Sequence, residues 1–156
     1  MKFVYLLSVY IHILCAALWI GGMLFLILVL LPAIKNNPHR RELIFSVGMK
    51  FRFVGWIALI LLLCTGLYNM YYRGVSITQV TDNSYSRLFG YKLLLFFVVV
   101  SISAYHDFYS GPKSLRVSAE DPKSKKLIRT ARIIGELNLL LALIAAGFGV
   151  AIVRGI

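Results

Sequence analysis

Four long apolar runs dominate this sequence and decide what it can fold into. They cover residues 3–31, 53–72, 88–109 and 133–153. A helix needs about 20 mostly apolar residues to cross the hydrocarbon core of a bilayer. A soluble domain of 156 residues with 60% hydrophobic residues and a mean hydropathy of +0.81 could not bury its apolar surface. We therefore expect an all-α integral membrane protein, in which residues 1–156 form a single four-helix transmembrane bundle.

The connections between these runs carry most of the charge. The net charge is +11, and basic residues gather between the first and second runs and between the third and fourth. The positive-inside rule then predicts an inner (plasma) membrane protein with loops 1 and 3 in the cytoplasm and both termini outside. Membrane lipids with anionic headgroups are the expected partners of these basic loops. The same placement argues against nucleic acid as a partner.

The segments that flank the runs predict where the helices end. The first run is too long for a signal-peptide core and continues into Pro32, so we expect it to be retained as a helix. The stretch 39–50 is amphipathic and is expected to lie at the membrane interface before the second helix. Short connections predict that sequential helices are antiparallel neighbours.

The two cysteines, Cys15 and Cys64, both lie in apolar runs. Neither belongs to a CxxC or CxxCH pattern, so the cysteines give no support for a zinc site or for covalent haem attachment. We expect both to be buried free thiols.

Two polar side chains are predicted to share the outer half of the membrane. His12 is the only imidazole of the first run, and a ligand-capable side chain in hydrocarbon indicates a function by default. With a rise of 1.5 Å per residue, His12 would lie about 12 Å inside the membrane and Lys92 about 6 Å inside. The alternatives are a hydrogen bond from His12 to a neighbouring helix and a Lys92 that snorkels outward.

A second polar group is expected near the cytoplasmic face, because His106 would lie about 27 Å from the outer surface. Interfacial ion pairs with snorkelling arginines would explain this group, and so would a proton-handling or anion-binding pocket. Guanidinium groups pair well with carboxylates, so the arginines would suit a propionate-bearing tetrapyrrole. Asp107 could fix the tautomer of His106. The members of this group are Arg52, His106, Asp107, Arg132, Glu136 and Asn138.

Several short motifs recur in order along the four runs. They are His12, Trp19, Gly21-Gly22 and Phe25; Arg52-Phe53, Gly55-Trp56 and Thr65-Gly66-Leu67-Tyr68; Lys92-Leu93-Leu94, His106-Asp107-Phe108 and Gly111-Pro112; and Arg132 and Gly135. Over nearly its whole length the chain thereby resembles the four-helix membrane family that contains the CopD-like domain and the HemJ-type protoporphyrinogen oxidases. The resemblance implies a b-type haem or related tetrapyrrole in the bundle. It also places His12 and Lys92 at the positions that matter most in HemJ-like proteins.

The leading hypothesis is a b-type haem-binding membrane redox protein, in which haem b is the cofactor and His12 is an axial ligand of the iron. The sixth ligand would come from Lys92, from His106 or from a second subunit's histidine, while Arg52 and Arg132 would hold the cofactor's carboxylates. A homodimer is plausible, because a bundle of this length has little volume for a haem. The redox partner would be a quinone or a porphyrin, and the sequence leaves open whether the protein is an enzyme of the HemJ-like oxidoreductase type.

Two alternatives come from other functional classes. A CopD-like copper transport or tolerance protein would use His12, Cys15 and Met70, since copper(I) prefers soft ligands. The sequence has no Met-x-x-Met or His-rich tract in favour of that assignment. A purely structural membrane subunit would hold no cofactor at all.

Overall fold

A computed structural model describes residues 2–116 and 121–154, apart from the side chains of residues 114–116 and 122. In that part of the chain every regular element is a helix. The elements are α1 (Lys2–Phe25), η1 (Leu26–Leu30), α2 (Leu31–Ala33), α3 (Arg40–Tyr72), η2 (Ile77–Gln79), α4 (Ser84–Tyr105), η3 (His106–Ser110), α5 (Gly111–Arg116) and α6 (Pro122–Arg154). The segments η1 and η3 are π-helical turns that continue α1 and α4, while η2 is a short 3₁₀ turn.

Within residues 2–116 and 121–154, four helical stretches are long and apolar enough to cross a membrane. They are Lys2–Ala33, Arg40–Tyr72, Ser84–Lys113 and Lys123–Arg154. This confirms the predicted all-α, four-helix membrane architecture. The orientation with both termini outside stays a prediction.

Two of the helices begin earlier than the apolar runs indicate. α3 begins at Arg40 rather than near residue 53, so residues 40–50 belong to the second long helix instead of preceding it. α6 begins at Pro122 rather than near residue 133. Helical hydrogen bonding does not depend on apolar side chains, and proline is favoured in the first turn of a helix. The charged turns therefore extend the helices beyond their apolar parts.

The start of α4 is fixed by a capping box. The side chain of Asn83 accepts a hydrogen bond from the backbone N–H of Ser86 at 2.8 Å, and Ser86 Oγ accepts one from the backbone N–H of Asn83 at 3.1 Å. The pair satisfies two backbone donors that would otherwise be unpaired at the helix end. α4 therefore begins at Ser84, a little before the apolar run that starts at residue 88.

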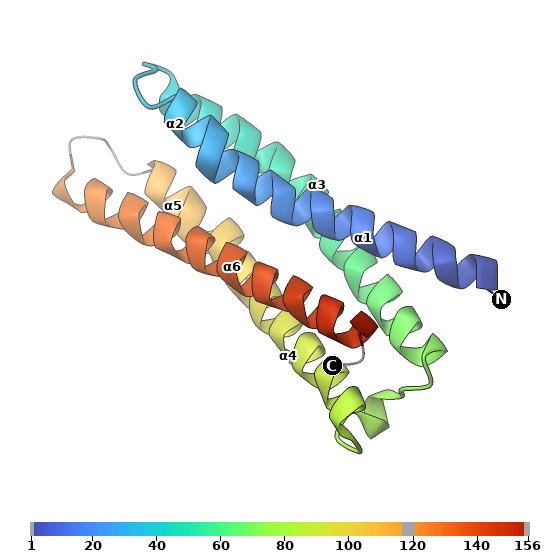
Figure 1. Cartoon of the computed structure of the whole chain (residues 1–156). Coiled ribbons are helices and arrows are strands. Elements are labelled where there is room, and N and C mark those ends of the chain that lie inside the picture. The colour runs from blue at the N-terminus through green and yellow to red at the C-terminus, as the bar shows by residue number, and fades with distance from the viewer. Residues whose placement is uncertain (1, 117–120, 155–156) are drawn as a thin grey trace.

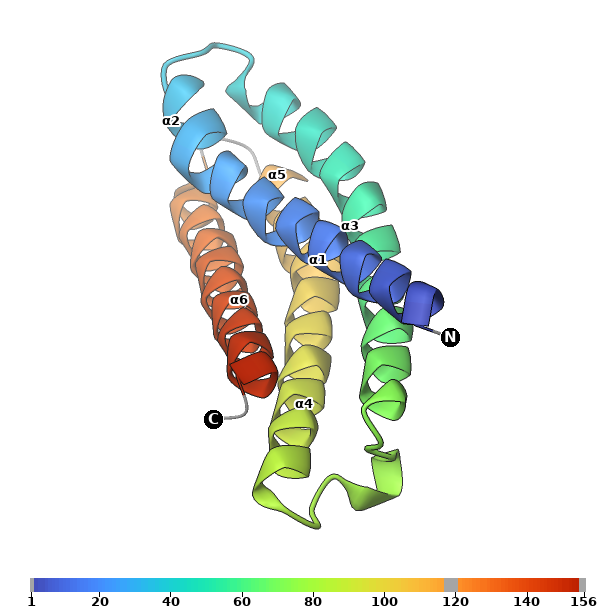
Figure 2. The same ribbon diagram turned by 45° about the vertical axis from the view of Figure 1, so that its right-hand side comes forward.

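The bundle consists of two helical hairpins, as the views in Figures 1 and 2 show. α1 packs mainly along α3, and α4 packs mainly along α6. Each hairpin joins helices that follow one another in the sequence, as predicted from the short connections, whereas the sequential helices α3 and α4 are not among the pairs that pack closely. The two termini lie toward the end of the bundle that carries the connection between α3 and α4 (Figure 1).

The hairpins meet in an apolar core near the middle of the helices. Trp19, Ala58, Leu59, Val99 and Ala142 are buried there and come from all four long helices. This shared core fixes the distance between the hairpins.

The two cysteines have different surroundings. Both are free thiols, and Cys15 is buried in the core. Cys64 is exposed, so the prediction that both thiols are buried is wrong for this residue. It lies on a face of α3 that no other helix covers, and an apolar thiol is tolerated on such a membrane-facing surface.

Small residues determine how closely α1 can approach α3. A Cβ atom at Gly22 would overlap the ring of Phe51, whereas a Cβ atom at Gly21 would meet nothing within 4 Å. Close helix contacts in membranes depend on such small residues. Of this glycine pair, Gly22 is the one that the packing requires.

Candidate functional site

The larger cavity of the bundle has a volume of about 850 Å³ and lies among α1, α3, α4 and α6. We call it the histidine cavity, and its chemically distinctive lining residues are His12, Met70, Arg73, Lys92 and Arg154. Most of its other lining residues are apolar. Its volume falls in the range of roughly 300–1,000 Å³ that is typical of small-molecule and cofactor sites.

His12 is held in one orientation by Thr65 of α3. His12 Nδ1 lies 2.8 Å from Thr65 Oγ1, and Thr65 Oγ1 lies 2.6 Å from the carbonyl oxygen of Leu61. The hydroxyl donates its hydrogen to that carbonyl, so it accepts the hydrogen bond from His12 Nδ1–H. The lone pair of a neutral imidazole then resides on Nε2, as in histidines that bind metals.

Gly66 and Met70 occupy the same face of α3 beside this imidazole. A Cβ atom at Gly66 would lie 3.3 Å from His12 Cε1, so the ring packs directly over the glycine. Met70 follows one turn later, and helical side chains lean toward the preceding turn. The buried Met70 thioether therefore lines the same cavity as His12 Nε2.

Lys92 reaches across the cavity toward α6. Its Nζ atom would lie 2.9 Å from a Cβ atom at Gly149, so the absence of a side chain at Gly149 leaves room for the amine. Among the described residues that line the cavity, none carries a carboxylate. Lys92 thus adds a positive charge to the cavity instead of extending to the membrane surface.

Arg73 forms the rim of the histidine cavity just after α3. Its Nε donates to the Tyr5 hydroxyl and its Nη1 donates to the Tyr85 hydroxyl, each at 3.1 Å. Hydrogen bonds to Tyr85 and Tyr5 raise the pKa of Arg73 above its ordinary value. The rim therefore carries a fixed positive charge.

A second, smaller cavity of about 310 Å³ lies toward the other end of the bundle. We call it the arginine cavity, because Arg40, Arg41, Arg52 and Arg132 all line it. Arg52 lies 5.6 Å from the centre of the Phe108 ring, which fits a cation–π contact. Arg132 Nε donates to Glu136 Oε1 at 2.7 Å, as residues four apart on one helix face can do.

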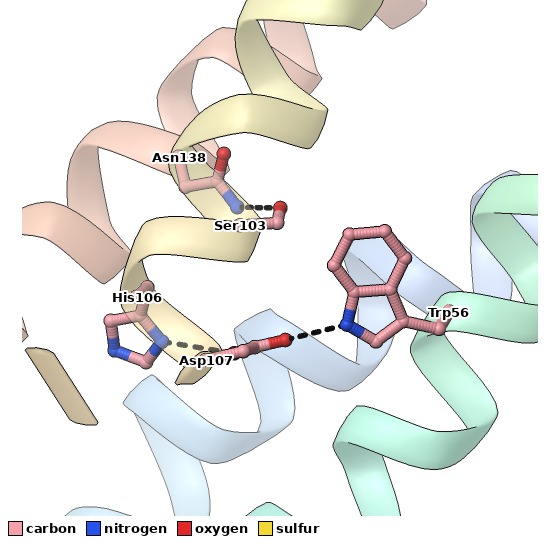
Figure 3. A network of polar contacts seen from close by, with 5 residues as sticks. All are labelled: Trp56, Ser103, His106, Asp107 and Asn138. Atoms are coloured by element: carbon pink, nitrogen blue, oxygen red, sulfur yellow. Dashed lines mark hydrogen bonds and ion pairs between the residues drawn. The ribbon is translucent and has the colours of Figure 1, made fainter. Parts of the chain in front are cut away.

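Polar contacts join several of the residues that line the arginine cavity (Figure 3). Asp107 lies between two partners: its Oδ2 accepts from Trp56 Nε1 at 3.2 Å, and its Oδ1 lies 3.1 Å from His106 Nδ1. Asn138 Nδ2 donates to Ser103 Oγ at 2.8 Å and joins α6 to α4. Asp107 thereby holds the imidazole so that Nε2 faces α6, where a Cβ atom at Gly135 would lie 3.7 Å away.

The structure separates the site residues predicted from the sequence into two groups. His12 and Lys92 line the histidine cavity, while His106 lines the arginine cavity together with the two predicted arginines. Trp19 and Leu59 belong to the lining of both cavities and form the wall between them. A single haem bound by both His12 and His106 would have to cross that wall.

Three residues that line or shape these cavities are not among the site residues predicted from the sequence. Thr65 was noted only as part of a motif, although its spacing of four from Leu61 predicts a hydroxyl-to-carbonyl bond within a helix. Arg40 and Arg41 lie in the stretch 39–50, which the apolar runs place ahead of the second helix. In the structure they belong to the first turn of α3, so both arginines share the end of the bundle with His106.

The cavities offer few of the usual metal ligands. Across residues 2–116 and 121–154, no three His, Cys, Asp or Glu side chains are grouped so that they could hold a metal ion together. Cys15 is buried in the core and is not among the residues that line the histidine cavity. Any metal bound there would depend on His12 and on softer or neutral partners.

Comparison with known proteins supports one branch of the family resemblance. A protein of Aquifex aeolicus (strain VF5), described as uncharacterized, is 37% identical over 151 residues, which are 96% of this chain and 95% of that protein. No solved structure matches the chain. The model of the family described as Copper resistance protein D matches residues 46–153, a region that includes Met70, Lys92 and His106 and begins after His12. The match covers more than half of the sequence, and the chain therefore belongs to the CopD family of multi-pass membrane proteins.

Proposed function

We propose that this CopD-family protein handles copper(I) as its cargo in the membrane, with His12 and Met70 as ligands. The observation that carries the proposal is the His12 imidazole, whose Nδ1–H is bonded to Thr65 while Nε2 is left for a ligand. A thioether and a neutral imidazole are both ligands that copper(I) accepts. The family's description as a copper resistance protein agrees with this chemistry.

The surroundings favour transient over permanent binding. Within the part of the chain that the structure describes, the lining of the histidine cavity offers His12 and Met70 but neither a thiolate nor a carboxylate. Lys92 and Arg73 add positive charge, which weakens the binding of a cation. Weak binding suits a cargo that must leave again, as in transport or in a tolerance system of the plasma membrane.

Titration of the purified protein with copper(I) tests this proposal. In competition with a chromophoric chelator, we expect about one copper(I) per chain, with the affinity more than about 100-fold lower in His12→Ala and in Met70→Leu, because loss of a ligand costs more than loss of a partner that orients it. Met49→Leu is the matched control, because Met49 lines the arginine cavity. Unchanged copper(I) affinity in both folded variants would refute the assignment.

A b-type haem at His12 is the second candidate, and the size and charge of the histidine cavity favour it. Aromatic side chains of Trp19, Phe89 and Phe96 line the cavity. Arg73 at the rim suits a carboxylate of the macrocycle. A bound haem would supply one-electron chemistry, while His12 would hold the iron and Lys92, after loss of its proton to the neutral amine, would be a further ligand in the same cavity.

An absorption spectrum separates the two candidates. Protein produced with ample haem, measured as isolated and after dithionite, would show a Soret band and sharp α and β bands if a six-coordinate haem is bound. We expect His12→Ala to lose those bands under the haem hypothesis, and Met70→Leu to keep them. A folded wild-type protein without porphyrin absorbance would leave copper(I) as the remaining cargo or cofactor.

A further inference from the structure

The arginine cavity holds more positive charge than its own residues balance. Arg132 is paired with Glu136, and the carboxylate of Asp107 already accepts from Trp56 and contacts His106. Asp107 is the one acidic residue among the described side chains that line the cavity. Arg40 and Arg52 therefore face the cavity without an ion pair to a carboxylate among the described side chains of the lining.

Two of these arginines present buried nitrogens without a hydrogen-bond partner. Arg40 Nε and Arg52 Nε are both inaccessible to solvent, and neither has a partner within the described part of the chain. A buried donor on a charged group is unfavourable when it has no hydrogen-bond partner, because the loss of its water is not compensated. Such atoms indicate a site at which an external acceptor completes the hydrogen bonding.

Most of the rest of the lining is apolar, and much of it belongs to the parts of α1, η1 and α3 that face the cavity. Leu30, Ile44, Phe45 and Phe51 are examples. An occupant that matches both parts of the lining must carry an anionic head and an apolar body. A phospholipid has that form, whereas a free inorganic anion would leave the apolar walls uncovered.

We propose that the arginine cavity binds the phosphate headgroup of an anionic phospholipid, with an acyl chain along the apolar wall. Arginine binds phosphate oxygens through two parallel N–H donors, so Arg40 and Arg52 are the expected contacts. Basic pockets between transmembrane helices are known to bind anionic headgroups on the cytoplasmic side, which is the side predicted for this end of the bundle. The site is independent of the copper(I) or haem site, because Trp19 and Leu59 separate the two cavities.

Native mass spectrometry of the detergent-solubilised protein tests the proposal. The probes are phosphatidylglycerol and phosphatidylcholine with identical acyl chains. We expect one phosphatidylglycerol to be retained per chain, with about a tenfold preference over phosphatidylcholine. The double variant Arg40→Gln and Arg52→Gln should lose that preference.

A matched control separates this site from general surface attraction. Arg129 is exposed on α6 and is not among the cavity's lining residues, so Arg129→Gln removes a charge from the same end of the bundle without changing the cavity. This variant should keep the preference. Arg40→Lys with Arg52→Lys keeps the charge but loses the paired donors, and a partial loss of preference in this variant supports the site even if the glutamine variant fails to fold.

Three results would overturn the proposal. The first is equal retention of the two lipids by the wild-type protein, and the second is an equal loss of preference in Arg129→Gln. The third is saturable binding of inorganic phosphate, dependent on Arg40 and Arg52, with no preference for the anionic lipid. That result would assign the cavity to a free anion.

Discussion

His12 of α1 and Thr65 of α3 form a hydrogen bond of 2.8 Å between the two helices of one hairpin. The same hydroxyl donates to the carbonyl oxygen of Leu61 at 2.6 Å, so its proton is committed and the imidazole must be the donor. A helix–helix contact thus also selects the tautomer of a candidate ligand. The ligand chemistry of His12 depends on a residue that never reaches the ligand itself.

Thr65→Val removes the acceptor of this hydrogen bond while it keeps the shape of the side chain. We expect copper(I) affinity to fall about tenfold or more, because partners that orient a ligating histidine typically contribute roughly 10–100-fold. Chelator competition measures the effect. Thr65→Ser, which keeps the hydroxyl, should restore most of the affinity.

Ser101→Ala is the control for Thr65→Val. Ser101 Oγ also donates to a carbonyl of its own helix, that of Phe97 at 2.8 Å, but it is exposed and lines neither cavity. The Ser101→Ala variant should bind copper(I) as the wild type does. Equal affinity in Thr65→Val and Ser101→Ala would show that orientation of His12 does not matter for binding.

The Lys92→Leu variant distinguishes copper(I) from haem by the direction of its effect on binding. Copper(I) affinity should rise roughly tenfold, because a positive charge is removed from a cavity of low dielectric constant. Haem binding should instead weaken or shift to a five-coordinate spectrum, because a candidate ligand is lost. Lys50→Leu, at an exposed position outside both cavities, should change neither.

Gly22→Ala should destabilise the contact between α1 and α3, because the added Cβ atom overlaps the ring of Phe51. We expect a loss of about 1–3 kcal/mol in the free energy of unfolding, which is usual for overpacked sites. Unfolding in mixed detergent, followed by circular dichroism, measures the loss. Gly21→Ala has open space around its Cβ atom, and a similar loss in that variant would contradict the packing argument.

The bond between Asn138 and Ser103 should contribute modestly to stability. Asn138 Nδ2 donates to Ser103 Oγ at 2.8 Å, but its Oδ1 is buried without a partner in the described residues. A double-mutant cycle of Asn138→Leu and Ser103→Ala should give a coupling energy of about 0.6 kcal/mol, the usual value for such bonds in membranes. Because the unsatisfied Oδ1 also disappears, the double variant should unfold at nearly the same detergent fraction as the wild type. A coupling energy near zero would mean that the hydrogen bond adds nothing to the fold.

The fold followed from the sequence because hydropathy and length alone decide which segments can span a membrane. The helix ends did not follow, because hydropathy reports the apolar part of a helix and says nothing of its charged turns. Arg40 and Pro122 both begin helices well outside the apolar runs. Pro122 was a usable signal, since proline favours the first helical position.

The site followed from the sequence in part. Counting the helical rise correctly separated His12 and Lys92 from His106, because depth depends only on position along a helix. Which side chains share a cavity also depends on the direction in which each one points around its helix axis. The depth of a residue gives no information on that direction. Cys15 shows the difference: it lies one turn from His12, yet it is buried in the core and does not line the cavity.

The wall between the two cavities also provides an optical reporter. Trp19 and Trp56 are the two tryptophans of the chain. In a Trp56→Phe variant, the emission of the protein would come from the indole of Trp19 alone, which borders both cavities. A copper or haem bound beside His12 would quench that emission, while a lipid bound beside Arg52 would shift its wavelength. One fluorophore native to the chain would therefore report occupancy of each cavity separately, without any attached label.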